Sequence, residues 1–143
     1  MLPVPVSDIS RVMGLKKGVG DVEHLMQAIE HGLPKQTLST VLAFFSGREA
    51  LSRNDLLGKV VSLATFKRRK LLKPEEGEKV ARLARLIAYA RFVWDRDDEA
   101  VREFFVSPHP LLERRRPLDL AFSELGAMKV ERILTSILHG LPA

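Results

Sequence analysis

The sequence predicts an all-α fold, and two observations support this prediction. Apolar residues recur at three- and four-residue spacings through most of the chain, for example at Val22, Leu25 and Ile29, which is typical of one face of a helix. No segment alternates apolar and polar residues as a half-buried strand does. The 143 residues, 45% of them hydrophobic, are enough for one domain with a core.

Capping residues and helix breakers divide the first part of this pattern. One helix follows Asp21, a favourable N-cap, and ends at His31-Gly32. Pro34 is placed to open the next helix and Gly47 to close it. The residues expected to face inward are Val22, Leu25, Met26, Ile29, Leu38, Val41, Leu42 and Phe45.

Three further helices follow. Ser52 and Ser62 are N-caps of two short ones, joined by a turn that contains Gly58. Pro74, followed by two glutamates, opens a long helix that reaches Trp94.

The last third is helical as well. Asp97 or Asp98 caps one helix, prolines in SPHP and RRRP interrupt the chain, and Ser123 caps the final helix. The expected inward face of that helix consists of Val130, Ile133, Leu134, Ile137 and Leu138. The tetrapeptide HGLP occurs twice, at 31–34 and 139–142, and because its flanks differ we interpret it as one helix stop used twice.

Residues that carry catalytic or metal chemistry are mostly missing from the sequence. It has no cysteine, its four histidines are scattered, and its glycines form no phosphate-binding loop. The acidic DRDDE segment lacks the glycine and the distal glutamate of an EF-hand, so it fits a helix N-terminus better. We therefore expect no enzyme, no cofactor and no metal. Since no apolar run approaches about 18 residues and the N-terminus does not resemble a signal peptide, we expect a cytoplasmic protein without a membrane partner.

Positive charge is concentrated in one stretch, although the formal net charge is only +5. Between positions 59 and 73 there are six basic residues and no acidic one, namely Lys59, Lys67, Arg68, Arg69, Lys70 and Lys73. This asymmetry favours a polyanion such as nucleic acid. The alternative is an exposed loop that binds nothing.

The two short helices have the size of a helix-turn-helix, whose second helix reads the major groove. In that arrangement Leu63, Ala64 and Phe66 would hold the second helix to the body. The candidate DNA-binding residues are Ser62, Thr65, Lys67, Arg68, Arg69 and Lys70. A short basic connecting helix without a ligand is the competing interpretation.

Longer segments of the chain carry a family resemblance. From about Asp21 to the end, through "TLSTVLAFF", "LLGKVVSLATFKRRK" and "PLDLAFSELGAMKVERILTSILHGLPA", the sequence resembles the Xre/MbcA/ParS antitoxins. The most specific part is the Pro-Leu-Asp-Leu turn at 117–120 followed by Ser-x-x-Gly at 123–126. The resemblance implies a helix-turn-helix bundle at 21–85 continuous with a small helical toxin-binding domain at 86–143, preceded by an N-terminal arm at 1–20.

The resemblance also implies a function. Such antitoxins bind and neutralise a RES-domain toxin, which resembles ADP-ribosyltransferases and uses NAD⁺, and many repress their own operon by binding operator DNA. The runner-up is a helix-turn-helix regulator whose C-terminal helices only dimerise. A neighbouring RES-type reading frame would distinguish the two.

The final helix and the residues after it are the candidate toxin contact. An apolar end that contains proline loses little entropy when a pocket orders it, and an NAD⁺ cleft would accept it; the alternative is a frayed terminus. The candidate toxin-binding residues are Lys129, Arg132, Ser136, His139, Gly140, Leu141, Pro142 and Ala143.

A homodimer is also expected. Tyr89, Phe92 and Trp94 point to more faces of the long helix than one core covers, and repressors of this type read paired half-sites.

Overall fold

The computed structural model describes residues 4–16, 19–46 and 52–140, and every regular element in these ranges is helical, which confirms the all-α prediction. The helices are α1 (Val6–Val12), α2 (Val22–His31), α3 (Gln36–Ala43), α4 (Arg53–Gly58), α5 (Leu63–Arg68), α6 (Pro74–Val93), α7 (Asp98–Val106), a 3₁₀ turn (Pro110–Leu112), α8 (Pro117–Leu120) and α9 (Glu124–Leu138). Within the described ranges, no helix is long and apolar enough to cross a membrane.

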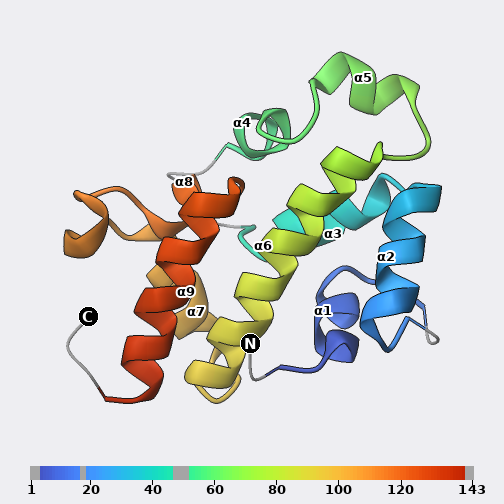
Figure 1. Cartoon of the computed structure of the whole chain (residues 1–143). Helices are drawn as coiled ribbons and strands as arrows, with labels where there is room; N and C mark the ends of the chain where they lie inside the picture. The colour runs from blue at the N-terminus through green and yellow to red at the C-terminus, as the bar shows by residue number, and fades with distance from the viewer. Residues whose placement is uncertain (1–3, 17–18, 47–51, 141–143) are drawn as a thin grey trace.

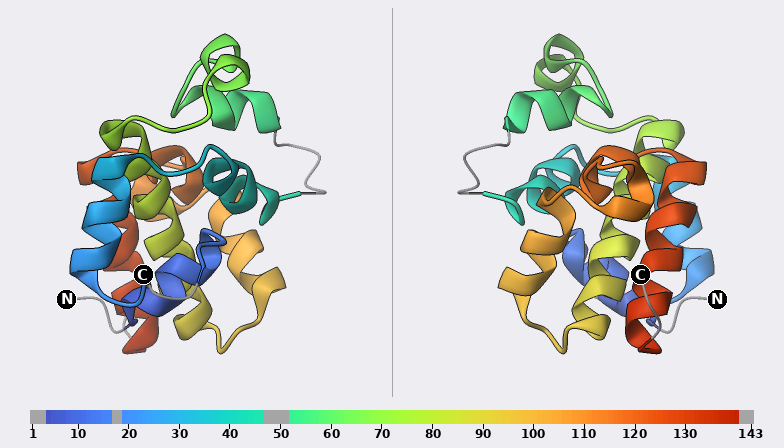
Figure 2. Two further views of the ribbon diagram at one scale, coloured as in Figure 1. Left: turned by 90° about the vertical axis from the view of Figure 1, so that its right-hand side faces the viewer. Right: turned by 90° about the vertical axis from the view of Figure 1, so that its left-hand side faces the viewer.

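Helix α6 is the centre of the molecule, and α1, α2, α3, α7 and α9 all pack against it (Figure 1). A broad stripe along its middle is buried, since Leu83, Ala84, Leu86 and Ile87 are each at most 1% exposed, while Arg82 and Arg85 lie on the remaining, partly exposed side. A helix with so wide an apolar face belongs to the centre of a domain. Helices α4 and α5 stand apart at one end, away from the C-terminal end of α9, in all the ribbon views (Figure 2).

Five of the predicted helix starts are confirmed, because their caps are local. The side chains of Asp21, Ser52, Ser62, Asp97 and Ser123 each accept a hydrogen bond from the backbone N–H three residues later. Such caps satisfy donors that the first turn of a helix leaves unpaired.

Pro34 does not open α3, which begins at Gln36. It forms an isolated antiparallel bridge with Leu71 instead, flanked by hydrogen bonds from Lys35 N to Lys70 O and from Leu72 N to Leu33 O, at 3.1 and 2.8 Å. The first HGLP is thus more than a helix stop, because it ties the α2–α3 turn to the segment that follows α5. The two segments approach closely at Gly32, which has φ +104°. A Cβ added to Gly32 would lie 3.3 Å from the Leu71 side chain and from Leu72 O.

Part of the predicted inward face of α2 is exposed. Val22 and Met26 are 60% and 48% exposed, because α2 packs through a narrower stripe that contains Leu25 and Ile29. The first 20 residues are more than an arm, since they include α1, which lies on α6 and buries Ile9.

The aromatic residues of the long helix are largely covered within one chain. Tyr89 is 2% exposed and its hydroxyl lies 2.6 Å from Thr135 Oγ1 on α9. Trp94 packs against Phe104 in a tilted arrangement, with ring centroids 5.1 Å apart. Only Phe92 of the three remains exposed, at 50%, so two of the three residues do not support the dimer argument.

Candidate functional site

Helix α5 is held to the body by little apolar packing. None of its residues is buried, and only Phe66 packs partly against the core. Leu63 is 38% exposed and Ala64 is exposed, so the prediction that both hold the helix to the body is wrong. The reason is the position of α5 beyond the end of α6, where only one side of the helix meets the rest of the protein (Figure 1).

Polar contacts position α5 instead. The Lys35 ammonium group donates a 2.8 Å hydrogen bond to Phe66 O and lies 4.9 Å from the centroid of the Phe66 ring. A cation is favourable there because the carbonyl groups at the end of a helix carry partial negative charge. Lys35 therefore anchors the helix that carries the candidate DNA-binding residues.

Arg69 is a second anchor. Its guanidinium forms a 2.7 Å ion pair with Glu76 on α6, and the two side chains are 26% and 13% exposed. Burial raises the pKa of Glu76, but hydrogen bonds from Arg69 and from Lys73 N outweigh it and hold that pKa below its ordinary value. The structure thus places Arg69, a predicted DNA contact, against a carboxylate.

The hydroxyl groups of Ser62 and Thr65 are joined. Ser62 Oγ accepts from Thr65 N at 3.2 Å and donates to Thr65 Oγ1 at 2.8 Å. Ser62 uses its hydroxyl hydrogen in this contact, whereas the hydrogen of the Thr65 hydroxyl stays available to an outside acceptor. Ser62 is therefore foremost a helix cap, and Thr65 is the better candidate donor.

The remaining predicted cations of this end face solvent. Lys67, Arg68 and Lys70 are exposed, and among the described residues their side chains form no hydrogen bond or ion pair. Arg68 borders an open hollow between α5 and the start of α6, which Lys59, Lys73 and Lys79 also line. Lys79 escaped the sequence analysis because it lies outside the basic run, and α6 brings it back to this hollow.

Helix α9 forms the second candidate surface. As predicted, Val130, Ile133 and Leu134 are buried, whereas Ile137 and Leu138 are only half-buried near the end of the helix. Of the candidate toxin-binding residues, Lys129, Arg132, His139 and Gly140 are exposed and Ser136 is half-buried, while Leu141, Pro142 and Ala143 lie outside the described residues.

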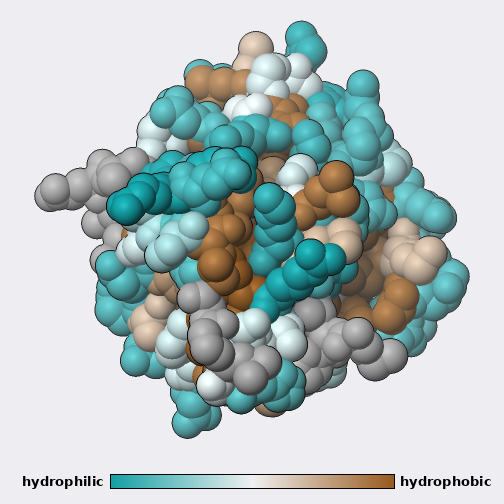
Figure 3. All heavy atoms as spheres, turned by 60° about the vertical axis from the view of Figure 1, so that its left-hand side comes forward, coloured by the Kyte–Doolittle hydropathy of each residue, from teal (hydrophilic) through white to brown (hydrophobic). Residues whose placement is uncertain are grey.

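Two exposed apolar residues on α9 were not predicted. Leu125 is 74% exposed and Met128 is 40% exposed, and both share a helical stripe with Arg132. Met128 and Arg132 line an open hollow on the outer side of the helix, together with Glu131, Thr135 and Ser136. On this side of the molecule, apolar side chains gather near the centre with charged ones around and between them (Figure 3). The sequence contains a signal for this exposure, because the helical spacing of Leu125 and Met128 places both opposite the buried stripe of α9.

Ion pairs fix α9 on the central helix. Arg85 pairs with Glu131 at 2.7 Å and Arg82 with Glu124 at 3.2 Å. Arg82 also donates to Phe122 O at 2.9 Å, just before the helix starts. The outer face of α9 is therefore presented on a rigid support.

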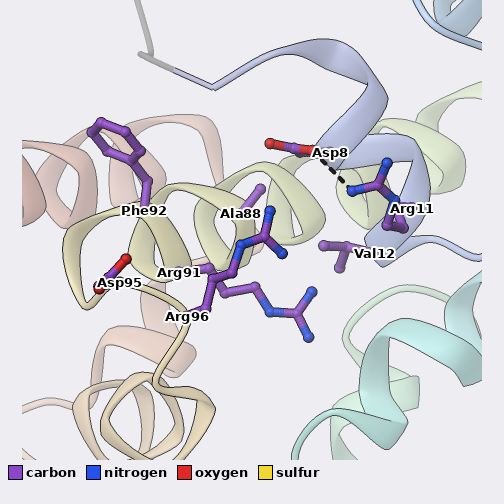
Figure 4. Close-up of a pocket in the computed structure, with 8 residues that line it drawn as sticks. All are labelled: Asp8, Arg11, Val12, Ala88, Arg91, Phe92, Asp95 and Arg96. Carbon is purple, nitrogen blue, oxygen red and sulfur yellow. Dashed lines mark hydrogen bonds and ion pairs between the residues drawn. The ribbon is translucent and has the colours of Figure 1, made fainter.

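A further pocket, between α1 and the end of α6, contains none of the predicted site residues (Figure 4). Figure 4 shows arginine side chains from both helices gathered around it. Two of them are already paired, Arg11 with Asp8 at 3.3 Å and Arg91 with Asp98 at 2.8 Å. Among the described residues, no group of histidines and carboxylates could hold a metal ion.

Comparison with known protein families matches both halves of the chain. Residues 24–85 match the antitoxin Xre-like helix-turn-helix domain, and residues 89–140 match the antitoxin Xre/MbcA/ParS C-terminal toxin-binding domain. The chain belongs to the Xre/MbcA/ParS antitoxin family. It is accordingly a non-enzymatic protein with a helix-turn-helix DNA-binding domain and a domain that binds a toxin. Comparison with curated proteins gives no significant match.

The geometry of the antitoxin explains its Ser-x-x-Gly motif. Ser123 Oγ accepts from Gly126 N at 3.0 Å at the start of α9. A Cβ on Gly126 would lie 2.1 Å from Leu120 O, so no other residue fits without displacing backbone. The motif therefore fixes how α9 follows α8.

The Pro-Leu-Asp-Leu turn of the antitoxin is α8, and an ion pair holds it. Arg116 Nε and Nη2 donate to the two oxygens of Asp119 at 3.0 and 2.7 Å. These bonds hold the pKa of Asp119 below its ordinary value, against an opposing effect of burial.

Proposed function

We propose that this antitoxin neutralises a RES-domain, NAD⁺-consuming toxin by binding it directly with the outer face of α9 and blocking its active site with residues 140–143. The observation that carries this proposal is the exposed face of α9, where Leu125 and Met128 lie beside Lys129 and Arg132 within the matched toxin-binding domain. Exposed apolar residues with charged residues around them are typical of a protein–protein contact.

The proposal assigns different tasks to the parts of this surface. Lys129 and Arg132 contact the rim of the toxin cleft, because a cation in a pocket already lined with cations would be repelled. Leu141 enters deepest, since burying one leucine contributes about 1.5–3 kcal/mol.

NAD⁺ consumption by the toxin tests this function. Equal concentrations of the full-length antitoxin and of a variant without residues 141–143 are titrated into toxin and NAD⁺. We expect the truncated protein to protect at least tenfold less well, because about 1.4 kcal/mol of lost binding is a factor of ten. Its melting temperature and DNA binding should be unchanged, and equal protection by both proteins would contradict the blocking mechanism.

We also propose that the antitoxin represses its own operon through α4 and α5, as a homodimer that reads paired half-sites. Thr65, Lys67, Arg68 and Lys70 form the contact, supported by the open cationic hollow next to α5. We propose that residues 21–85 bind DNA and that residues 86–143 bind the toxin. Because both of these partners would be cytoplasmic, we expect the antitoxin in the cytoplasm.

The salt dependence of binding to its own promoter tests the DNA contact. Arg68→Ala should lower the slope of log affinity against log salt by about 0.9, the value of one phosphate contact. An unchanged slope would remove Arg68 from the interface. Light scattering of the antitoxin at tens of micromolar, with and without promoter DNA, tests the dimer, and a monomer in both cases would contradict it.

A further inference from the structure

The first turn of α5 exposes two apolar side chains. Leu63 and Ala64 follow the Ser62 cap directly; Leu63 is 38% exposed and Ala64 is exposed as well. Most apolar residues elsewhere in this domain are buried, among them Leu56 and Leu57 on the preceding helix, at 4% and 0% exposure. Leu63 and Ala64 therefore lie outside the core that buries the apolar residues of the preceding helix.

Cations accompany this pair on the same face. Leu63 lies one turn before Lys67, and Ala64 one turn before Arg68, so each apolar side chain has an exposed cation next to it along the helix. No acidic residue occurs between positions 59 and 73. An apolar strip bordered by cations alone is complementary to a ligand with apolar groups at the floor of a groove and phosphates along its edges.

The major groove of DNA has that chemistry. Thymine is the base that presents a methyl group there, and small apolar side chains recognise it by contact. In helix-turn-helix proteins, residues at the start of the second helix reach the base edges. We propose that Leu63 and Ala64 contact thymine 5-methyl groups, so that the antitoxin selects thymine in its binding site by apolar contact. This inference rests on the proposed role of α5 in DNA binding.

Removal of single methyl groups from DNA tests the inference. A preferred duplex is first selected with the full-length antitoxin from a random-sequence pool. Each thymine of that duplex is then replaced in turn by deoxyuridine, which pairs identically and lacks only the methyl group. We expect one or two positions in each half-site at which deoxyuridine weakens binding about fourfold, the factor for burying one methyl-sized group.

The variants Leu63→Ala and Ala64→Gly link this effect to the two residues. At the sensitive positions, the ratio of thymine to deoxyuridine affinity should fall toward one in one variant or the other. A substitution that merely loosens α5 weakens binding to both duplexes by the same factor and leaves the ratio unchanged. The ratio therefore separates base contact from a structural role.

The remaining outcomes overturn different claims. If the pool yields no preferred duplex, the proposed DNA-binding function fails. If a duplex is selected but no deoxyuridine position matters, or if the ratio persists in both variants, the DNA-binding function stands and the reading of thymine by Leu63 and Ala64 is wrong.

Discussion

The two proposed functional surfaces of this antitoxin are supported in opposite ways. Helix α9 rests on the central helix through fully buried side chains such as Val130 and Leu134, with ion pairs along its edge. Helix α5 buries none of its side chains and is positioned by the Lys35 hydrogen bond and the Arg69–Glu76 ion pair. Substitutions near α9 should therefore change global stability, whereas substitutions near α5 should change DNA binding and leave the fold intact.

The largest expected difference comes from Phe→Ala made once in the domain that contains α9 and once on α5. Phe105, on α7 of that domain, is completely buried, and Phe105→Ala should lower the free energy of unfolding by about 3–5 kcal/mol. Phe66 is half-buried, so Phe66→Ala should cost about 1 kcal/mol and weaken DNA binding by removing the ring that packs on Lys35. Denaturant unfolding measures the first effect and promoter binding the second. Equal destabilisation by the two variants would contradict the comparison.

A glycine pair sharpens the contrast. Gly126→Ala forces a Cβ against Leu120 O and should destabilise by about 3 kcal/mol, with loss of toxin binding. At Gly58, on α4, a Cβ meets nothing within 4 Å, so Gly58→Ala should be neutral or stabilise by up to about 1 kcal/mol. Thermal melting compares the two variants. A Gly126→Ala protein as stable as the parent would contradict the close approach of Gly126 to Leu120 O.

Lowering the pH should reveal a smaller difference in stability between the two regions. The pKa of Asp119 is lowered in the folded protein, so its contribution is complete above the unfolded value and is lost as the pH falls through the folded value. Asp119→Asn should therefore cost about 1 kcal/mol at pH 7, and this cost should shrink as the pH falls through the folded-state pKa. Glu76→Gln should show the same trend with less than half the effect, because its ion pair fixes only α5. Unfolding measured from pH 7 to 2 checks both, and a cost that grows toward low pH would have the wrong sign.

The sequence predicted what depends on neighbours along the chain. Each confirmed N-cap, such as Asp21 or Ser123, bonds a group only three residues away, so the composition of one turn decides it. The inward residues Val130 and Leu134 were likewise predictable, since a long helix with one support has one regular buried stripe.

What could not be predicted depends on where the helices lie. The exposure of Leu63 and Ala64 follows from the position of α5 beyond α6, and the pairing of Arg69 follows from the path of the chain into α6. The exposure of Leu125, by contrast, follows from its spacing opposite the buried stripe of α9, and the structure adds its extent, 74%.

The central claim, that DNA and toxin are bound by separate surfaces, is tested most directly by two matched double variants. Lys67→Ala with Arg68→Ala, and Lys129→Ala with Arg132→Ala, each remove two exposed cations from one helix. Promoter affinity and protection against NAD⁺ consumption are measured for both. We predict that the α5 variant loses promoter binding and protects normally, and that the α9 variant does the reverse; a variant that loses both activities while folded, or neither, would contradict the account.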